Sequence, residues 1–239
     1  MNPLISIAIP TYEFNGMGSE FLEFSLKKIE AQSFTDYNVI VSDNSKDTSI
    51  QNLCSKWEKK IDLRYSAFTA SYGSIGPNLN NVLELSNGKF TKILLQDDFF
   101  YSPQSLELLA PHLTSDKSWI INACTHTENG GKSFIRPYSP KYDHQGMKAG
   151  KNTLSCPSSL TLNNKHGPYL FNPTLKFYLD CEFYCRMFHA FGAPAIIPDI
   201  LTVNRIHSAS QTKELLTSPT PEWHYLYEWQ TLQHLTRDL

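Results

Sequence analysis

Two adjacent carboxylates, Asp97 and Asp98, follow an apolar run at 93–95 and are themselves followed by Phe99 and Phe100. A hard divalent cation such as Mg²⁺ or Mn²⁺ binds one or two carboxylates together with the phosphates of a substrate. The same pair is also compatible with a polar strand end whose charges are solvated. Successive strand residues point to opposite faces, so both carboxylates reach one site only if the chain turns there, as we expect.

A third acidic residue, Asp43, lies in the sequence Ser-Asp-Asn-Ser at 42–45, after another apolar run. Residues of these types often form a turn or cap the following helix. The functional alternative is a carboxylate that accepts hydrogen bonds from a nucleobase edge or a ribose. Neither a glycine-rich dinucleotide fingerprint nor a P-loop follows the first apolar run, which excludes those two ways of binding phosphates.

The elements that must position these residues alternate between strand and helix in the first half of the chain. Leu22, Leu26 and Ile29 recur at helical spacing, Gly88 is expected to close the third helix, and Pro103 is expected at the first position of the fourth. The predicted strands are 4–9, 37–43, 61–67 (at or near an edge) and 89–95, and the predicted helices are 19–32, 47–60, 76–88 and 102–113.

This alternation predicts a mostly parallel sheet covered by helices. Ligands of such sheets bind beyond the carboxyl ends of the strands. The first strand ends at 10–13, the second at 42–45 and the fourth at 96–98, and all three segments are polar. We therefore expect these three strand ends to meet at one edge of the sheet, where a ligand binds.

The second half of the chain is less regular, and no linker or repeat divides it from the first. We expect strands at 119–124 and 158–164, a long loop region at 125–152, a helix at 179–191, one or two short strands within 193–207, and an aromatic helix at 221–235. Cys181 and Cys185 share a helix face, and we expect them to pack in the core rather than bind a metal.

Composition limits the class of protein. The chain has 239 residues, 41% of them hydrophobic, and a formal charge of −2, which favours a globular domain and argues against a general nucleic-acid binder. The first residues lack the features of a signal peptide, and no apolar stretch is long enough to span a membrane. Five cysteines without a CxxC argue against a disulfide framework. We expect a cytoplasmic protein.

Three stretches, "ISIAIPTYE", "VIVSDNSKDTS" and "GPNLNNVLELSNGKFTKILLQDD", occur in the order and spacing of the nucleotide-binding half of family 2 glycosyltransferases. The resemblance covers roughly residues 4–100 and continues more weakly at 178–187 and 204–212. It implies a single α/β domain of the GT-A type. The nucleotide-sugar would bind to 1–100, 101–212 would be the irregular acceptor and catalytic half, and 213–239 would be a helical tail.

The resemblance also implies roles for the strand ends. Pro10, Thr11, Tyr12 and Glu13 would line the nucleotide base and ribose, and Asp43 would accept a hydrogen bond from the base, usually uracil.

Residues 96–98 would be the DxD element of the family, although Gln96 stands where the first acidic residue is common. Asp97 would lie near the ribose or the sugar, and Asp98 would bind Mn²⁺ or Mg²⁺. His207 and Arg205 would contact the metal or the diphosphate. For His207, an ordinary surface or core position is an equal alternative.

Asp180 would be the general base of an inverting transfer from a nucleotide-sugar, most often a UDP-sugar, to a hydroxyl of a glycan or glycolipid-type acceptor. Glu182 is its nearest rival. The alternative from another class of function is a catalytically silent domain that binds nucleotides or glycans on the same fold.

Acceptor recognition is expected within 125–175. Four side chains there either stack on sugar rings or pack in the core: Tyr138, Tyr142, His144 and Tyr169. The aromatic tail, with Trp223, Tyr227 and Trp229, is expected to pack on the domain or to pair two subunits in a homodimer.

Overall fold

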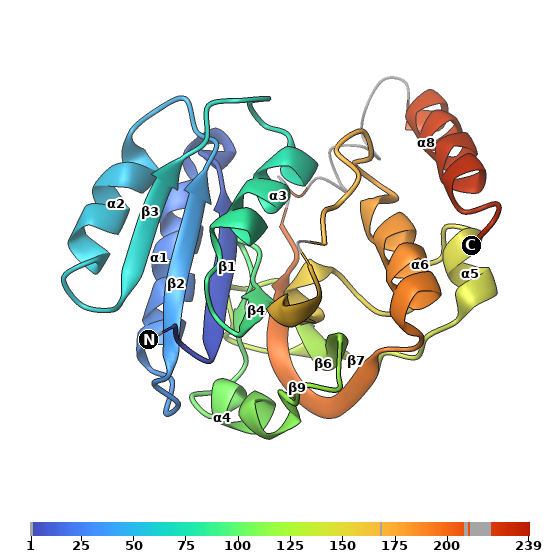
Figure 1. Cartoon of the computed structure of the whole chain (residues 1–239). Helices are drawn as coiled ribbons and strands as arrows, with labels where there is room; N and C mark the ends of the chain where they lie inside the picture. The colour runs from blue at the N-terminus through green and yellow to red at the C-terminus, as the bar shows by residue number, and fades with distance from the viewer. Residues whose placement is uncertain (1, 168, 208–209, 211–220) are drawn as a thin grey trace.

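The computed structural model describes residues 2–167, 169–207, 210 and 221–239. Its strands form one curled sheet in the order β3-β2-β1-β4-β8-β6-β9-β5, and β7 pairs with β6 outside this path (Figure 1). The strands are β1 Ile5–Thr11, β2 Tyr37–Asp43, β3 Leu63–Ala67, β4 Phe90–Ile93, β5 Phe99–Phe100, β6 Trp119–Thr127, β7 Ile135–Tyr138, β8 Leu160–Asn163 and β9 Ala195–Arg205.

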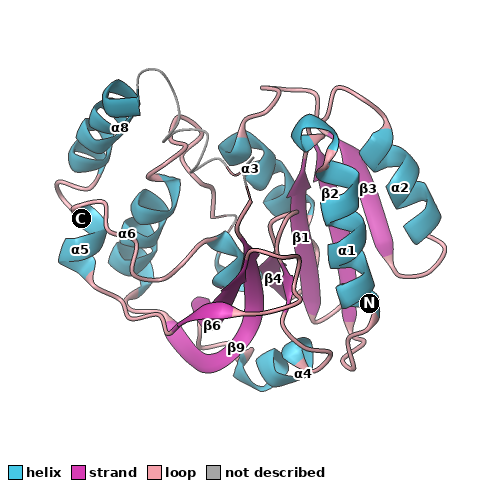
Figure 2. Cartoon of the chain, turned by 180° about the vertical axis from the view of Figure 1, so that it is seen from behind, coloured by secondary structure: helices cyan, strands magenta, loops and turns pink. Residues whose placement is uncertain are grey.

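The first four strands run parallel to one another, as the sequence predicts, and β3 lies at the edge. Alternation along β1 decides which helix covers which face, because successive side chains point to opposite sides. Ile5, Ile7 and Ile9 pack in one core with the helices α1 Gly18–Glu30 and α2 Ser49–Trp57. Ala8 faces the other side and packs with Val82 of α3 Ile75–Leu85. The two views confirm that α1 and α3 lie on opposite faces (Figures 1 and 2).

The second half widens the sheet with antiparallel pairs. Strand β8 runs antiparallel to both β4 and β6, whereas β6 and β9 are parallel. The whole sheet is therefore mixed: its first half is entirely parallel, and its second half combines antiparallel pairs with the parallel pair of β6 and β9. The remaining helices are α4 Ser105–Leu109, α5 His144–Lys148, α6 Leu179–Phe191 and α8 Pro221–Leu235.

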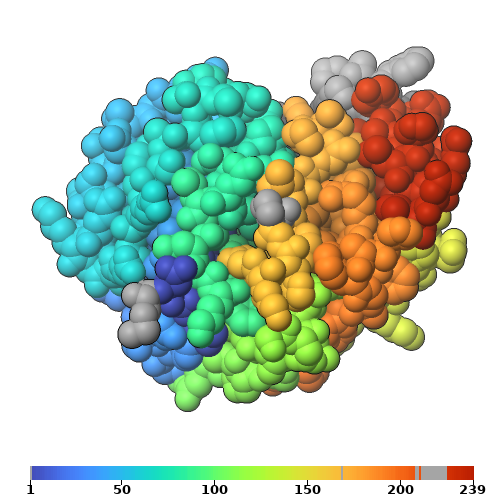
Figure 3. Space-filling model, viewed as in Figure 1, coloured from blue at the N-terminus to red at the C-terminus, as the bar shows by residue number. Residues whose placement is uncertain are grey.

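A second core holds the later elements together. It joins α6 to β8, to Trp119 of β6 and to Leu232 of α8. Cys181 and Cys185 are buried in this core as free thiols, as the prediction of core packing requires. The space-filling view shows the blue-to-teal and the yellow-to-red parts of the chain in contact over the face seen (Figure 3).

Several predicted boundaries were wrong. The predicted loop at 125–152 contains the end of β6, all of β7 and α5, and the segment 193–207 forms one long strand, β9. The fourth helix begins at Ser105 rather than Pro103, because Ser102 closes a turn in which Ser105 N donates to Ser102 O. Gly88 does not end α3. Instead it touches β1, where a Cβ at this position would lie 2.5 Å from Ser6 N.

Among the described residues, no helix is both long enough and apolar enough to cross a bilayer. The stretch 211–220, which includes the start of the predicted tail, lies outside the described residues.

Candidate active site

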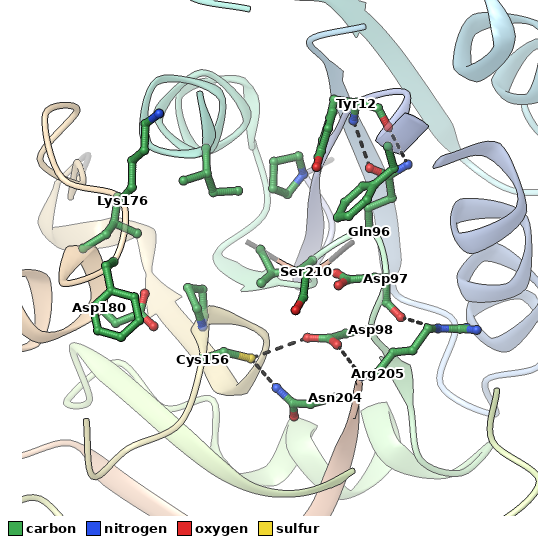
Figure 4. Close-up of a pocket in the computed structure, with 17 residues that line it drawn as sticks. Tyr12, Gln96, Asp97, Asp98, Cys156, Lys176, Asp180, Asn204, Arg205 and Ser210 are labelled. Atoms are coloured by element: carbon green, nitrogen blue, oxygen red, sulfur yellow. Dashed lines mark hydrogen bonds between the residues drawn. The ribbon is translucent and has the colours of Figure 1, made fainter. Parts of the chain in front are cut away.

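A cleft of about 270 Å³ opens at the carboxyl ends of β1 and β4, and the start of α6 and the end of β9 form its other walls (Figure 4). The sequence predicted eleven site residues. Seven of them line this cleft: Pro10, Tyr12, Gln96, Asp97, Asp98, Asp180 and Arg205. Thr11, Glu13, Asp43 and His207 do not line it.

The chain turns at the two adjacent carboxylates, as predicted, because Asp98 N donates to Leu95 O over 3.0 Å. The turn gives the two side chains different surroundings. The side chain of Asp97 keeps 17% of its surface exposed, whereas Asp98 is 4% exposed.

Asp98 already has a protein donor at each carboxylate oxygen. Its Oδ2 accepts from Ser158 Oγ at 2.6 Å and from Cys156 Sγ at 3.5 Å, and its Oδ1 accepts from Arg205 N at 2.9 Å. Burial, and secondly the charge of Asp97, raise the pKa of Asp98 well above its ordinary value. The donors only partly offset this effect.

His207 pairs with Asp97 rather than with Asp98. Its Nε2 lies 2.9 Å from Asp97 Oδ2, and its ring lies between Phe14 at 5.3 Å and Phe21 at 4.8 Å. This aromatic enclosure keeps the imidazole behind the cleft wall.

In the described part of the chain, no group of three or more His, Cys, Asp or Glu side chains is placed to hold a metal ion. A hard cation in a phosphate site needs only one or two protein carboxylates. The partly exposed Asp97 satisfies that need, and the buried His207 Nδ1 has no hydrogen-bond partner. The carboxylates of Asp97 and Asp98 therefore fit a divalent cation that also binds substrate phosphates, whereas His207 contacts Asp97 from behind the cleft wall. Asp98 would have to exchange its present donors.

Arg205 supports the turn. Its Nε donates to Asp97 O over 2.9 Å, and its guanidinium lies 4.8 Å from the ring centre of Phe21 and 4.9 Å from that of Phe24. Burial lowers the pKa of Arg205, and the nearby Asp97 and Asp98 oppose that shift. The side chain thus stacks on rings while its backbone caps Asp98.

The hydrogen bonds of Gln96 explain why this position holds an amide rather than a carboxylate. Its Oε1 accepts from Tyr12 N at 2.9 Å, and its Nε2 donates to Tyr12 O at 3.0 Å and to Gly18 O at 2.7 Å. An ionised aspartate cannot donate to two carbonyl groups. The amide therefore ties the end of β1 to the end of β4.

Asp43 lies behind the wall, 3% exposed. Its carboxylate accepts from Ser45 N at 3.0 Å, from Ser45 Oγ at 2.6 Å and from Tyr65 OH at 2.9 Å. Thr11 Oγ1 donates to the same carboxylate over 3.4 Å. Burial raises the pKa of Asp43, although these donors oppose the shift. In this structure the Asp43 carboxylate is thus held by donors of the protein, from Ser45 in the turn that follows it, Tyr65 of β3 and Thr11 of β1.

Glu13 is similarly engaged, since its carboxylate accepts from Lys46 N at 3.2 Å. Thr11 is buried at the end of β1. Of the four residues at 10–13, the cleft is lined by Pro10 and Tyr12 alone, because alternate positions point away from it.

Asp180 lies at the start of α6, across the cleft from the acidic turn (Figure 4). Burial raises the pKa of Asp180 to about 7, and a hydrogen bond from Asn152 opposes the shift. Its rival Glu182 is 2% exposed and forms an ion pair with Arg186 on the same helix, away from the cleft. Of the two carboxylates, only Asp180 meets the cleft.

Sequence reasoning missed ten lining residues: Phe14, Ile75, Leu95, Cys156, Pro157, Lys176, Phe177, Leu179, Asn204 and Ser210. Most are ordinary apolar residues that carry no chemical signature. The four candidate stacking residues do not line the cleft. Tyr142 stacks on Phe188 at 4.5 Å and meets His144 at 2.9 Å, and Tyr169 packs on Phe191 at 5.1 Å.

A parallel β-α-β half that ends in adjacent carboxylates, with an aspartate across the cleft, is the arrangement of a GT-A glycosyltransferase. A model of glycosyl transferase family 2 matches residues 6–188, which is more than half of the chain. The chain therefore belongs to glycosyl transferase family 2, which confirms the resemblance found in the sequence.

One curated relative from Campylobacter jejuni, GalNAc(5)-diNAcBac-PP-undecaprenol beta-1,3-glucosyltransferase, is 31% identical over 137 residues. The match covers 55% of this chain and 41% of that relative, so the chain matches less than half the length of the relative.

Two solved structures share the fold. TarS 1-349 of S. aureus in complex with UDP-GlcNAc superposes with a TM-score of 0.73 at 19% identity, over 100% of this chain and 68% of that one. The mannosyltransferase PcManGT of Pyrobaculum calidifontis, in complex with GDP-Man and Mn²⁺, gives 0.61 at 13% identity, over 99% and 74%. These likenesses confirm the α/β fold of the GT-A type.

Proposed function

We propose that this protein is a metal-dependent, inverting glycosyltransferase that moves a sugar from a UDP-sugar to a hydroxyl of a glycan or glycolipid-type acceptor. The observation that carries the proposal is the position of Asp180 across the cleft from Asp97 and Asp98. In a displacement reaction the leaving group and the nucleophile lie on opposite sides of the reacting carbon, and the two sides of the cleft suit these two positions. The diphosphate leaves on the side of the acidic turn, and the acceptor attacks from the side of α6.

The acidic turn, residues 95–98, would hold Mn²⁺ or Mg²⁺ through the carboxylates of Asp97 and Asp98, and His207 would orient Asp97 through their contact. Such a cation supplies neutralisation of the negative charge that develops on the leaving diphosphate. The turn is fixed for this task by Gln96 and Arg205, because both bind its neighbours through the hydrogen bonds described above.

Asp180 would take the proton of the acceptor hydroxyl. A hydroxyl is a poor nucleophile, and a carboxylate with a pKa near 7 is a better base at neutral pH than an ordinary one. Attack from the α6 side opposite the leaving group is one in-line displacement, which inverts the anomeric centre.

A UDP donor is favoured by the surroundings of Tyr12 and Asp43. Tyr12 lines the cleft beside Pro10, and Asp43 lies directly behind this wall, paired through β2 with Thr11 of β1. On binding, Asp43 would give up one of its present donors to accept from uracil. The neighbours named above were solved with UDP-GlcNAc and with GDP-Man, so the choice rests on these two residues.

A lipid-linked glycan is one acceptor of the proposed class, because the curated relative is named for an undecaprenol-linked saccharide. The cleft opens beside Lys176 and Phe177, which gives the acceptor side a cation and an aromatic ring.

Paired substitutions test the proposal. Asp180→Asn should leave UDP-sugar binding nearly intact and lower turnover by roughly 10²-fold or more, the usual contribution of a positioned base. Glu182→Gln should retain more turnover, because Glu182 lies outside the cleft. Chelation should abolish transfer by the wild type, and Mn²⁺ or Mg²⁺ should restore it.

Three outcomes would contradict parts of the proposal. Full activity in excess chelator would exclude a role for the metal. An active Asp180→Asn variant together with an inactive Glu182→Gln variant would show that Glu182, and not Asp180, is the base. Donor binding without turnover across a panel of acceptors would instead favour a silent binding domain.

A further inference from the structure

The carboxylate of Glu228, on helix α8, binds the backbone just before the helix that carries Asp180. Its oxygens accept from Lys176 N at 3.1 Å, from Phe177 N at 2.7 Å and from Tyr178 N at 3.2 Å. Lys176 N also reaches the other oxygen at 3.1 Å. Three successive N–H groups that converge on one point form an anion-binding nest. In this protein, a side chain 50 residues further along the chain fills the nest.

The nest leads directly into α6. Tyr178 is the residue before the first turn of α6, and its side chain makes no capping hydrogen bond. Lys176, Phe177 and Asp180 all line the cleft. The hydrogen bonds to Glu228 therefore fix the backbone on which the acceptor-side wall of the cleft is built. A negative charge near the first turn of a helix is also favourable to the helix dipole.

Glu228 is well placed to act as a fixed point. It is 7% exposed, and its helix is anchored by the fully buried Leu232 and by the ring of Tyr225, 4.4 Å from that of Phe177. Buried charges are normally paired or hydrogen-bonded, and Glu228 is stabilised here only by backbone donors among the contacts the structure describes. Its neighbours on the outer face, Tyr227 and Trp229, are 68% and 41% exposed.

We propose that Glu228 is a positioning residue for sugar transfer: it holds the segment 176–178 so that the Asp180 carboxylate and the Phe177 ring face the acceptor. This role rests on the proposed function of Asp180 as the base. It assigns the C-terminal helix to the catalytic apparatus of its own chain, beyond packing or subunit pairing.

Hydrogen exchange and kinetics of Glu228→Ala test the proposal. Without the carboxylate, three part-buried N–H groups lose their acceptor, so the amides of 176–178 should exchange at least 10-fold faster. The kcat should fall 10-fold or more, whereas the KM for the donor should change less than 3-fold, because the donor side lies on the other half. Glu228→Gln keeps one acceptor oxygen and should be intermediate. Trp229→Ala, on the exposed face of the same helix, is the control and should match the wild type.

A double-mutant cycle separates this proposal from the proposed function. If Glu228 acts through Asp180, Glu228→Ala should cost little further activity in an Asp180→Asn background. Unchanged amide exchange, or losses that simply multiply, would overturn the positioning role even though transfer persists. If the wild type transfers no sugar, the function itself fails, and the exchange result still decides whether the carboxylate holds the segment. Should Glu228→Ala not fold, the same measurements on Glu228→Gln decide.

Discussion

Asp180 has surroundings that set its chemistry as much as its position does. Burial raises the pKa of its carboxyl group to about 7, and one hydrogen bond from Asn152, at 3.3 Å, opposes the shift. Asp180 therefore changes charge in the pH range where a general base is useful. Asp98 also has a raised pKa, but both of its carboxylate oxygens already accept from donors of Cys156, Ser158 and Arg205.

The pKa of Asp180 predicts the pH dependence of turnover. Below about pH 7 the carboxyl group is protonated and cannot take a proton, so kcat should fall about 10-fold per pH unit, and above pH 7 it should level off. The measurement is kcat at saturating donor from pH 5 to pH 9. The fall in kcat below pH 7 should be absent in Asp180→Asn and present in Glu182→Gln. A fall that persists in Asp180→Asn would assign the titration to another group.

Lys92 is a fully buried lysine beneath the acidic turn. Its Nζ donates to Asn122 Oδ1 at 2.7 Å and to Ser158 O at 2.6 Å, and the hydroxyl of the same Ser158 donates to Asp98. Burial lowers the pKa of Lys92 to about 7. The lysine thus supports the residue that caps Asp98 without touching the carboxylate in the contacts described here.

Lys92→Met should destabilise the protein by about 1–3 kcal/mol, because two buried acceptors lose their donor. The difference in unfolding free energy between the wild type and Lys92→Met should grow as the pH rises from 7 to 10. In that window the unfolded lysine stays protonated while the folded one is neutral, so raising the pH favours the folded wild type. Urea unfolding at several pH values measures this difference. Lys89→Met, at an exposed position just before the same strand, should change stability by less than about 0.5 kcal/mol. A difference that shrinks with pH would show that Lys92 is buried in its charged form.

At the scale of elements, the edge of the cleft depends on a bridge between two strands that are neighbours in the sheet but far apart in sequence. Gln96 follows β4, and the backbone groups it binds follow β1. Phe14 and Asn15, in the turn after β1, have positive φ angles of 50° and 53°. That turn is therefore a conformation that the bridge helps to maintain.

Gln96→Glu should destabilise the protein by about 1–3 kcal/mol, because an ionised carboxylate cannot donate to the two carbonyl oxygens that the amide now satisfies. Thermal unfolding at pH 8 measures the loss. Gln51→Glu, at an exposed position of α2, should be within about 0.5 kcal/mol of the wild type. Equal stability of the two variants would contradict the bridge.

The elements differ in how far the sequence could predict them. Strands β1 and β2 are rich in apolar residues, β4 leads into the apolar run at 93–95, and the stripe of Leu22, Leu26 and Ile29 marks α1, so the parallel half was predicted closely. Strand β7 has only half-buried and exposed residues, and its pairing to β6 is a tertiary contact with no local signature. The helix predicted at 102–113 was too long because Pro111 interrupts it with a 3-10 turn.

The site divides in the same way. Carboxylates at strand ends are visible in a sequence, and Asp97, Asp98 and Asp180 do meet in one cleft. The direction in which a side chain points is set by turns that only the fold fixes, which is why Asp43 and Glu13 bind within the protein. The role of Glu228 depends on backbone N–H groups, which every residue except proline carries, so no residue pattern could reveal it.

At the scale of the whole molecule, one sheet runs between two hydrophobic cores. Trp57 belongs to the first core and Trp119 to the second, and β4 pairs with both β1 and β8. Because β4 is hydrogen-bonded to a strand of each half, we expect the chain to behave as a single domain.

Two variants test this expectation, one that keeps only Trp57 and one that keeps only Trp119, with the remaining tryptophans changed to phenylalanine. Their fluorescence should change at the same urea concentration and at the same concentration as the far-UV circular dichroism, since coincident transitions indicate one cooperative unit. Midpoints that differ between the two probes would show that the halves unfold separately.

The partners of Asp98 also fix the order in which the cleft is completed during synthesis. Ser158 and Arg205, which bind its carboxylate, are made 60 and 107 residues after it. At about 5–20 residues per second, Arg205 follows Asp98 by roughly 5–20 s. The parallel strands can pair while the ribosome is still working, but the carboxylates at their ends wait for residues not yet translated. The nascent protein therefore acquires the parallel half of its sheet early and its cleft late, and any factor that protects the unfinished edge has seconds in which to act.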